Sequence, residues 1–279
     1  MQSEGIVSRE ESEEAERRSR PRAAVIFEAI RREGETALDR GSWPLFWSAL
    51  ASGLSMVFSL VASGVIRAAL PDSPARALLT AFGYTFGFVI VILGRQQLFT
   101  ENTLTPLLPI FADPKAWRLR ELARIWTVIL IGNVIGTGVA SAAVALGGAF
   151  SPAQHHAFVE LARQTVGPPL PQIFVKAVFA GWIIALMVWL LPLAEQLGPL
   201  VIVFLTWLIA ASSLEHIIAG SADAFFGVWS GATTWGDLVH FFVPTLLGNI
   251  VGGVALVAAI SSAEIIAERQ KRQRYLREA

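Results

Sequence analysis

The chain has 279 residues, of which 54% are hydrophobic and only 16% are charged, and its formal net charge is zero. A mean hydropathy of +0.56 is typical of a membrane protein and excludes an ordinary soluble globular domain. The absence of cysteine excludes disulfides, thiolate metal sites and cysteine nucleophiles.

Residues 1–42 predict a charged tail that contains an amphipathic helix. The segment from Glu10 to Arg22 mixes both signs of charge, and the start lacks the apolar stretch of a signal peptide. The helix has a charged side, with Arg31 and Glu35, opposite an apolar side. The apolar side consists of Ala24, Ile26, Phe27, Ile30, Ala37 and Leu38. We expect the helix to lie along the inner membrane face, and a gating role is the alternative.

Six apolar runs free of charge follow in a predicted channel domain, residues 43–266. They are 43–66, 77–94, 125–150, 177–194, 196–214 and 238–263. Each is near the roughly 20 residues that a helix needs to cross hydrocarbon. Six spans place both tails on one side, and 17 of the 22 basic residues lie in the tails and the 112–124 loop. We therefore expect both termini, including tail 267–279, to be cytoplasmic in a bacterial inner membrane.

The second and fifth apolar regions, 77–112 and 196–236, are too long for single straight spans. Polar breaks interrupt them at 98–103 (LFTENT) and 214–221 (LEHIIAGS). Each break is followed by a Gly-Asn pair, and the two pairs lie 116 residues apart. This internal duplication has three spans per half, so the halves must be inverted. We predict an all-α membrane protein with six transmembrane helices in an inverted 3+3 repeat, in which helices 2 and 5 are broken.

The breaks predict a substrate pathway, because irregular backbone at membrane depth must face protein or a cavity. A short half-helix that begins at each break would point its partly positive N-terminus at the centre, which favours an anion. The expected walls are apolar: Tyr84, Phe88, Leu98, Phe99, Val188 and Ile209. A bare anion crosses such walls at great cost, whereas its neutral acid crosses more easily. A central proton donor would resolve this conflict.

His216 is the strongest candidate for that donor, since an ionisable group at membrane depth suggests function. The alternative is a neutral histidine that only ties the broken backbone together. Thr100 lies 116 residues earlier, at the matching position by that offset, and its hydroxyl could orient an imidazole or an anion. The alternative for Thr100 is a bond to backbone freed by the break.

Other polar residues surround the breaks. We expect Asn133 and Asn249 mainly to satisfy break backbone, with substrate contact as the second interpretation. Glu101 and Glu215 flank the breaks, and Glu215 is expected to bond backbone there. Arg95 precedes the first break by one turn, and its fixed charge should not face lipid. Either it forms an internal ion pair with one of the two glutamates, or it adds positive potential that selects an anion.

These residues resemble the formate/nitrite transporter family. The similarity covers roughly residues 24–266 and is carried by Leu-Phe-Thr at 98–100, Glu-His at 215–216 and Gly-Asn-x-x-Gly at 248–252. The run 95–103 (RQQLFTENT) is similar to the YfdC-like branch. The sequence departs from the established channels at Arg95, where they have a small residue, and at Ala185, where they have an amide. Lys176 need not correspond to their vestibule bases.

The resemblance implies an aquaporin-like protomer, assembled as a homopentamer with one pore per protomer. It implies that His216 is a central proton-relaying histidine with Thr100 as its partner, and that the apolar wall residues form two constrictions. We therefore expect a channel or transporter in the lipid bilayer for small monovalent anions or their conjugate acids. No cofactor, metal site or nucleic-acid partner is expected. The alternatives are a neutral-solute or water channel and a non-conducting scaffold or sensor; an enzyme is disfavoured because no nucleophile or metal set is present.

Overall fold

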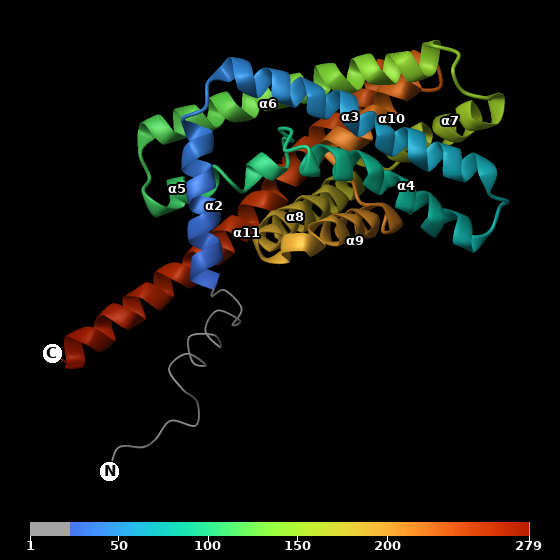
Figure 1. The fold of residues 1–279 in the computed structure, drawn as a ribbon. Helices are drawn as coiled ribbons and strands as arrows, with labels where there is room; N and C mark the ends of the chain where they lie inside the picture. The colour runs from blue at the N-terminus through green and yellow to red at the C-terminus, as the bar shows by residue number, and fades with distance from the viewer. Residues whose placement is uncertain (1–22, 279) are drawn as a thin grey trace.

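The computed structural model describes residues 23–278, and every regular element in that range is a helix (Figure 1). The charged stretch from Glu10 to Arg22 lies outside the described residues. The α-helices are α2 (Ala23–Leu38), α3 (Ser42–Ala69), α4 (Pro74–Leu93), α5 (Leu107–Ala112), α6 (Ala116–Leu146), α7 (Pro152–Val166), α8 (Leu170–Ala194), α9 (Gly198–Ala211), α10 (Ile217–Trp229) and α11 (Trp235–Glu278). Two short 3-10 helices are η1 (Glu101–Thr103) and η2 (Glu195–Leu197).

Five helices in the described range are long and apolar enough, by length and composition, to cross a membrane. They are α3, α4, α6, α8 and the Trp235–Ala259 part of α11. The chain is therefore an all-α membrane protein over the range described. The expected fifth span, 196–214, corresponds to α9, whose 14 residues are fewer than the roughly 20 that a crossing needs. α10 adds 13 more residues after an interruption.

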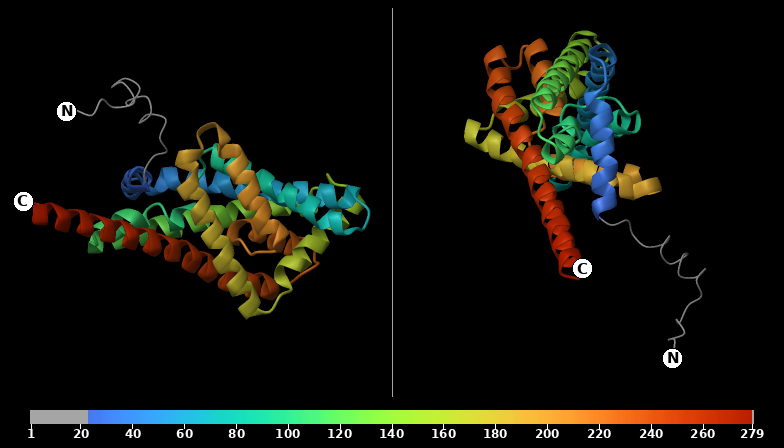
Figure 2. Two further views of the ribbon diagram at one scale, coloured as in Figure 1. Left: turned by 90° about the horizontal axis from the view of Figure 1, so that it is seen from below. Right: turned by 90° about the vertical axis from the view of Figure 1, so that its left-hand side faces the viewer.

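Several helices extend beyond the apolar runs that predicted them. α6 begins at Ala116 rather than at 125, and α8 begins at Leu170 rather than at 177. α11 continues as a helix to Glu278, through the predicted C-terminal tail, and projects past the other helices (Figures 1 and 2). A charge-free run marks only the part of a helix that suits hydrocarbon, whereas backbone hydrogen bonding continues into polar surroundings.

The helix α7 lies between the third and fourth apolar runs, and none of the predicted elements corresponds to it. It begins with a capping box, in which Ser151 and Gln154 bond each other's backbone N–H groups, and with a proline in the first turn. Its apolar side is buried through Ala157, Phe158, Ala162 and Val166. The Ser-Pro-Ala-Gln sequence at 151–154 is typical of a helix start, so α7 could have been predicted from it.

Two helix pairs pack in the same way. α3 lies against α6, and α8 lies against α11 (Figure 1). Gly132 of α6 meets the Ala49 side chain of α3, and Gly248 of α11 meets the Ala177 side chain of α8. A Cβ atom at either glycine would collide with its alanine, so small residues let the backbones approach. The duplication inferred from the Gly-Asn pairs is therefore also present in the packing.

The helix α2 lies beside the start of α6 and against α5, at the same end of the molecule as the C-terminal part of α11 (Figures 1 and 2). Ile26, Ile30 and Leu38 on its apolar side are buried. Gly34 lies directly against the Thr105 carbonyl, where a Cβ atom would not fit. On the charged side, hydrogen bonds from Arg31 and Arg32 lower the pKa of Glu28 to about 2.

Candidate functional site

The helices α4 and α9 end in the same backbone motif. α4 ends with hydrogen bonds from Arg95 N–H to Ile92 O and from Gln96 N–H to Val91 O, at 3.1 and 2.9 Å. α9 ends with the equivalent bonds from Ser213 N–H and Leu214 N–H, at 3.0 and 2.9 Å. This is the Schellman pattern, in which one residue takes the left-handed conformation.

Arg95 and Ser213 are those left-handed residues, with φ values of 48° and 51°. They lie 118 residues apart, so the entrances to the two breaks match at an offset of 118 rather than 116. By this register the counterpart of His216 is Leu98, and Thr100 matches Ile218. The expectation that Thr100 and His216 are equivalent positions was therefore wrong. The two Gly-Asn pairs are separated by 116 residues, whereas the left-handed residues at the two breaks are separated by 118.

An asparagine from a later helix, α6 for the first break and α11 for the second, clamps the backbone of each break. Asn133 Oδ1 accepts from Phe99 N–H at 2.9 Å, and its Nδ2 donates to the carbonyls of Ala49 and Gln97 at 2.8 and 2.9 Å. Asn133 and its counterpart at the second break, Asn249, are both fully buried. Each uses both of its amide hydrogens on backbone, which leaves neither free to donate to a passing solute.

Asn249 repeats the arrangement at the second break. Its Oδ1 accepts from Ile217 N–H at 2.8 Å, and its Nδ2 donates to the carbonyls of Ala177 and Glu215 at 2.8 and 2.9 Å. Corresponding hydrogen bonds of Asn133 and Asn249 differ in length by 0.1 Å or less. These bonds agree with the interpretation that the asparagines satisfy break backbone.

The structure brings His216 and Thr100 into direct contact. His216 Nε2 and Thr100 Oγ1 are 2.7 Å apart, and both residues are buried, at 1% and 0% exposure. His216 is also the N-cap of α10, since its Nδ1 accepts from Ala219 N–H at 3.2 Å. A neutral imidazole with Nδ1 as acceptor carries its proton on Nε2. His216 therefore donates to Thr100, whose own hydroxyl hydrogen remains available to a third group.

Apolar side chains enclose this pair. The ring of Phe88 lies edge-on to the His216 imidazole with centroids 4.9 Å apart, and Tyr84 lies 5.2 Å from Phe88. Five of the six predicted wall residues belong to one cluster: Tyr84, Phe88, Leu98, Phe99 and Ile209. Val188 does not; it packs in a separate cluster with residues of α2 and α5.

The charged residues near the breaks are arranged differently from expectation. Within residues 23–278 no hydrogen bond joins the Glu215 carboxylate to the backbone of the break; its Oε1 lies 3.8 Å from Lys176 Nζ. Arg95 is exposed, and among residues 23–278 it forms no ion pair with Glu101 or Glu215. Of the two alternatives for Arg95, the internal ion pair is therefore contradicted, since the side chain is exposed rather than paired. Glu101 is partly buried at the start of η1.

The expected short half-helix is present at only one break. α10 begins at Ile217, directly after His216. After the first break the chain forms η1 instead, and α5 begins at Leu107 with only six residues. The first break therefore lacks the helix N-terminus that was expected to face an anion.

One acidic residue of α10 was not singled out from the sequence. Asp223 lies on α10, and its Oδ2 accepts from Thr165 Oγ1 of α7 at 3.1 Å. A single aspartate inside the apolar stretch 217–229 was the available signal, because ionisable residues in such stretches are costly.

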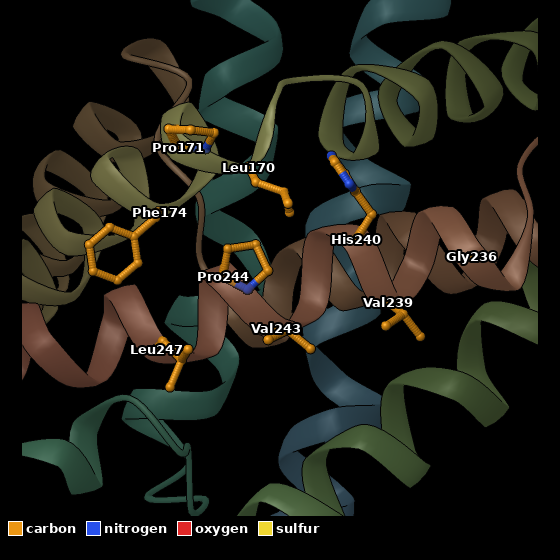
Figure 3. A pocket seen from close by; sticks show the side chains of 9 residues that line it. All are labelled: Leu170, Pro171, Phe174, Gly236, Val239, His240, Val243, Pro244 and Leu247. Atoms are coloured by element: carbon orange, nitrogen blue, oxygen red, sulfur yellow. The ribbon is translucent and has the colours of Figure 1, made fainter.

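An apolar groove of about 680 Å³ lies between α8 and α11, apart from the His216 pair (Figure 3). It is lined by Leu170, Pro171, Phe174, Gly236, Val239, His240, Val243, Pro244 and Leu247. Its one ionisable side chain, His240, is bonded through Nε2 to the Pro168 carbonyl at 3.0 Å. The groove therefore lacks the convergent polar groups of a solute site.

Comparison with known proteins identifies the family. The formate/nitrite transporter family model matches residues 24–263. The chain belongs to the formate/nitrite transporter family. It is 42% identical to the inner membrane protein YfdC of Escherichia coli strain K12 over 265 residues, which cover 91% of this chain and 86% of that one.

Two solved structures share the fold. An FNT family ion channel superposes with a TM-score of 0.74 at 18% identity, covering 88% of this chain and 99% of the other. A pentameric formate channel with formate bound superposes with a TM-score of 0.68 at 22% identity, covering 81% and 98%. The identities are low, so these likenesses establish the fold alone.

Proposed function

We propose that this member of the formate/nitrite transporter family conducts small monovalent anions or their conjugate weak acids, through a pathway centred on His216 and Thr100. The observation that carries the proposal is the buried 2.7 Å contact between these residues, which joins the two interrupted regions inside an apolar enclosure. The hydroxyl hydrogen of Thr100, which stays free because the imidazole N–H donates to the Thr100 oxygen, suits an anionic oxygen that has lost its water.

We further propose that His216 relays a proton to the solute at the membrane midplane. The N-cap bond sets a condition on this relay. Nε2 already holds a proton in the neutral ring, so a second proton can be added only at Nδ1. That proton would face Ala219 N–H, so protonation requires the cap to open. The relay therefore includes a small rearrangement at the start of α10.

The architecture in the membrane is also a proposal. The repeated packing of α3 with α6 and of α8 with α11 supports six crossings in an inverted 3+3 arrangement, with α4–α5 and α9–α10 as broken second and fifth spans. The basic residues of the tails and of the 112–124 loop support cytoplasmic termini in a bacterial inner membrane. The pentameric formate channel supports a homopentamer.

Reconstitution into liposomes tests the proposal. We expect the purified protein to carry formate, nitrite or acetate faster than protein-free liposomes, with flux that depends on pH. His216→Asn keeps an N-cap acceptor but cannot titrate, so it should assemble normally and lose the pH dependence. His216→Phe should lose the same dependence and, in addition, about 1 kcal/mol of capping energy.

Thr100→Val is the matched variant on the other side of the contact, and we expect it to lower flux while keeping pH dependence. An unchanged pH profile in His216→Asn would reduce His216 to a structural cap. Water flux without anion flux would favour the neutral-solute channel instead.

A further inference from the structure

Trp126 of α6 contacts the first break on both sides of Thr100, and the mechanism above gives it no role. Its indole Nε1–H donates to the Asn102 carbonyl at 2.8 Å, two residues after Thr100. Its ring lies edge-on to the ring of Phe99, the residue before Thr100, with centroids 6.1 Å apart. One rigid side chain thus contacts the break at 99 and at 102 and spans the residue that meets His216.

The sequence leaves the buried Asn102 carbonyl in need of such a donor. In an α-helix this carbonyl would accept from the backbone N–H four residues later, but that residue is Pro106, which has none. The two N–H groups directly before Pro106 both bond to the Glu101 carbonyl, at 3.3 and 3.4 Å. A buried carbonyl without a partner is costly, so the indole of Trp126 completes the hydrogen bonding of this segment.

The second break has no equivalent indole. Trp126 lies seven residues before the asparagine that clamps the first break, and the residue seven before the clamping asparagine of the second break is Phe242, which has no donor. There the chain continues as α10, and the His216 carbonyl accepts from Gly220 N–H at 2.9 Å. A regular helix satisfies its own carbonyls, so the indole is present at the break where no regular helix follows directly.

The position of Thr100 depends on such support more than that of His216 does. His216 begins a helix of 13 residues, whereas Thr100 precedes a 3-10 helix of three. A helix as short as η1 has little stability of its own. The hydrogen bond of 2.7 Å between Thr100 Oγ1 and His216 Nε2 tolerates little displacement. The groups that hold the backbone around Thr100 therefore set this contact.

We propose that Trp126 is a positioning residue, which places the Thr100 hydroxyl against His216 by bonding the Asn102 carbonyl and packing on Phe99. The inference rests on the proposed function, in which the pair of Thr100 and His216 is the centre of the pathway. Trp126 acts through the backbone of the break, so its loss should move Thr100 without removing any group from the pair.

A double-mutant cycle tests whether Trp126 acts through Thr100. Trp126→Phe keeps an aromatic ring beside Phe99 and removes the indole N–H. The full chain is reconstituted in phosphatidylcholine vesicles, with formate as the probe. We expect Trp126→Phe and Thr100→Val each to lower formate flux by up to about tenfold, as the loss of one hydrogen bond does. The double variant should carry as much formate as Thr100→Val alone, because a hydroxyl that has been removed cannot be misplaced.

Trp229→Phe is the matched control. The indole N–H of Trp229 donates to the Gly138 carbonyl of α6 at 3.0 Å, which is the same kind of bond at the opposite end of α10 from His216. Trp229→Phe should keep wild-type flux alone and should keep the flux of Thr100→Val when combined with it. Wild-type flux in Trp126→Phe would overturn the inference. So would effects of Trp126→Phe and Thr100→Val that multiply in the double variant, since Trp126 would then act independently of Thr100.

A structural measurement separates this inference from the proposed function. The chain has four histidines, so the imidazole nitrogen signals of labelled protein in nanodiscs can be resolved by NMR, and that of His216 assigned with His216→Asn. His216 Nε2–H loses its acceptor in Thr100→Val, and Trp126→Phe should shift the same signal in the same direction. An unmoved signal in Trp126→Phe would overturn the inference even if the protein conducts formate. Absence of flux in the wild type would overturn the proposed function, and the His216 signal alone would then decide whether Trp126 positions Thr100.

Pro106→Ala combined with Trp126→Phe is the second variant, for the case that Trp126→Phe does not assemble. Alanine supplies the N–H group that the Asn102 carbonyl lacks, so this variant should assemble and regain the wild-type His216 signal. A combined variant that stays unassembled, or that assembles with a displaced signal, would show that the indole is needed for more than this bond and would overturn the inference.

Discussion

The two breaks share a scaffold and differ in chemistry. Each follows a Schellman helix end, and each is held by a buried asparagine with three hydrogen bonds. At the second break His216 caps α10 directly, whereas at the first break Thr100 leads into η1. A duplicated sequence can therefore keep its backbone supports while one half takes the ionisable group and the other takes the hydroxyl that contacts it.

Side chains after the first break explain why no long helix starts there. Thr103 Oγ1 bonds the Thr100 carbonyl at 2.7 Å, and Asn102 Nδ2 bonds the Leu98 carbonyl at 2.8 Å. Such local bonds compete with regular helix formation. Pro106 and Pro109 lack N–H donors, which further limits α5. At the start of α10 the side chains of His216 and Ser221 also bond backbone. His216 caps the first turn and Ser221 bonds the carbonyl four residues earlier, so both bonds are compatible with the helix.

Removing a clamp tests the shared scaffold and should have the largest effect. Asn249→Ala leaves the Ile217 N–H and the Glu215 carbonyl of the break without their partner in the protein interior, and removes a second bond from the Ala177 carbonyl of α8. Each unsatisfied group costs about 1–3 kcal/mol, so we expect a loss of several kcal/mol or failure to assemble. Asn133→Ala should behave alike. Thermal unfolding in detergent measures both.

Thr206→Ala is the control for the clamps, because its hydroxyl bonds carbonyls of its own helix only. It should stay close to the wild type. A clamp variant as stable as this control would show that water replaces the amide and that the two breaks are held by other means.

The left-handed residues offer a smaller test. Arg95→Gly and Ser213→Gly should each raise stability by about 1 kcal/mol, since glycine adopts positive φ without the Cβ penalty. Arg95→Ala should leave stability nearly unchanged, since no ion pair with Glu101 or Glu215 is lost. A loss of several kcal/mol of stability in Arg95→Ala would instead support the buried ion pair that was one alternative from the sequence.

The smallest expected effect concerns α7 and α3, away from both breaks. The hydrogen bond from Arg67 lowers the pKa of Glu160 below its usual value of 4.5. A lowered folded-state pKa stabilises the fold above the usual value, and this stabilisation is lost as the pH falls through the folded-state pKa. The pair is partly exposed, so it contributes at most about 1 kcal/mol.

Glu160→Gln should therefore lower the melting temperature slightly near neutral pH and have no effect in strong acid, where the wild-type carboxyl is protonated. Glu121→Gln on α6, whose carboxylate pairs with Arg124 at 2.6 Å, is a comparable variant at the other end of the molecule. A decrease in the melting temperature of Glu160→Gln that is the same at every pH would indicate lost packing rather than lost charge.

The sequence predicted the membrane fold, the duplication and the contact between His216 and Thr100. Apolar runs indicate membrane helices because hydrocarbon excludes charge, and the Gly-Asn pairs are local enough to survive as a visible repeat. The offset between halves is not constant, however. Ala49 and Ala177, which occupy equal places against Gly132 and Gly248, are 128 residues apart. Insertions between elements shifted the register, so a single offset misaligned Thr100.

The other errors have a common physical origin. Arg95 and Glu215 were assigned partners from their positions beside the breaks, but the surroundings of a side chain there depend on the packing of other helices. Lys176 became the partner of Glu215 through the packing of α8, which no local pattern predicts. Asp223 contacts Thr165 because α7 packs against α10, which no local pattern predicts either.

His216 occupies a position with two duties, since one ring nitrogen ends a helix and the other contacts Thr100. This coupling constrains how the position can change during evolution. A descendant in which only the capping duty was retained could replace the histidine with asparagine, serine or aspartate, which also cap helices. Such replacements would leave a folded protein that retains its shape, so loss of transport in this lineage need not be accompanied by loss of the protein from the membrane.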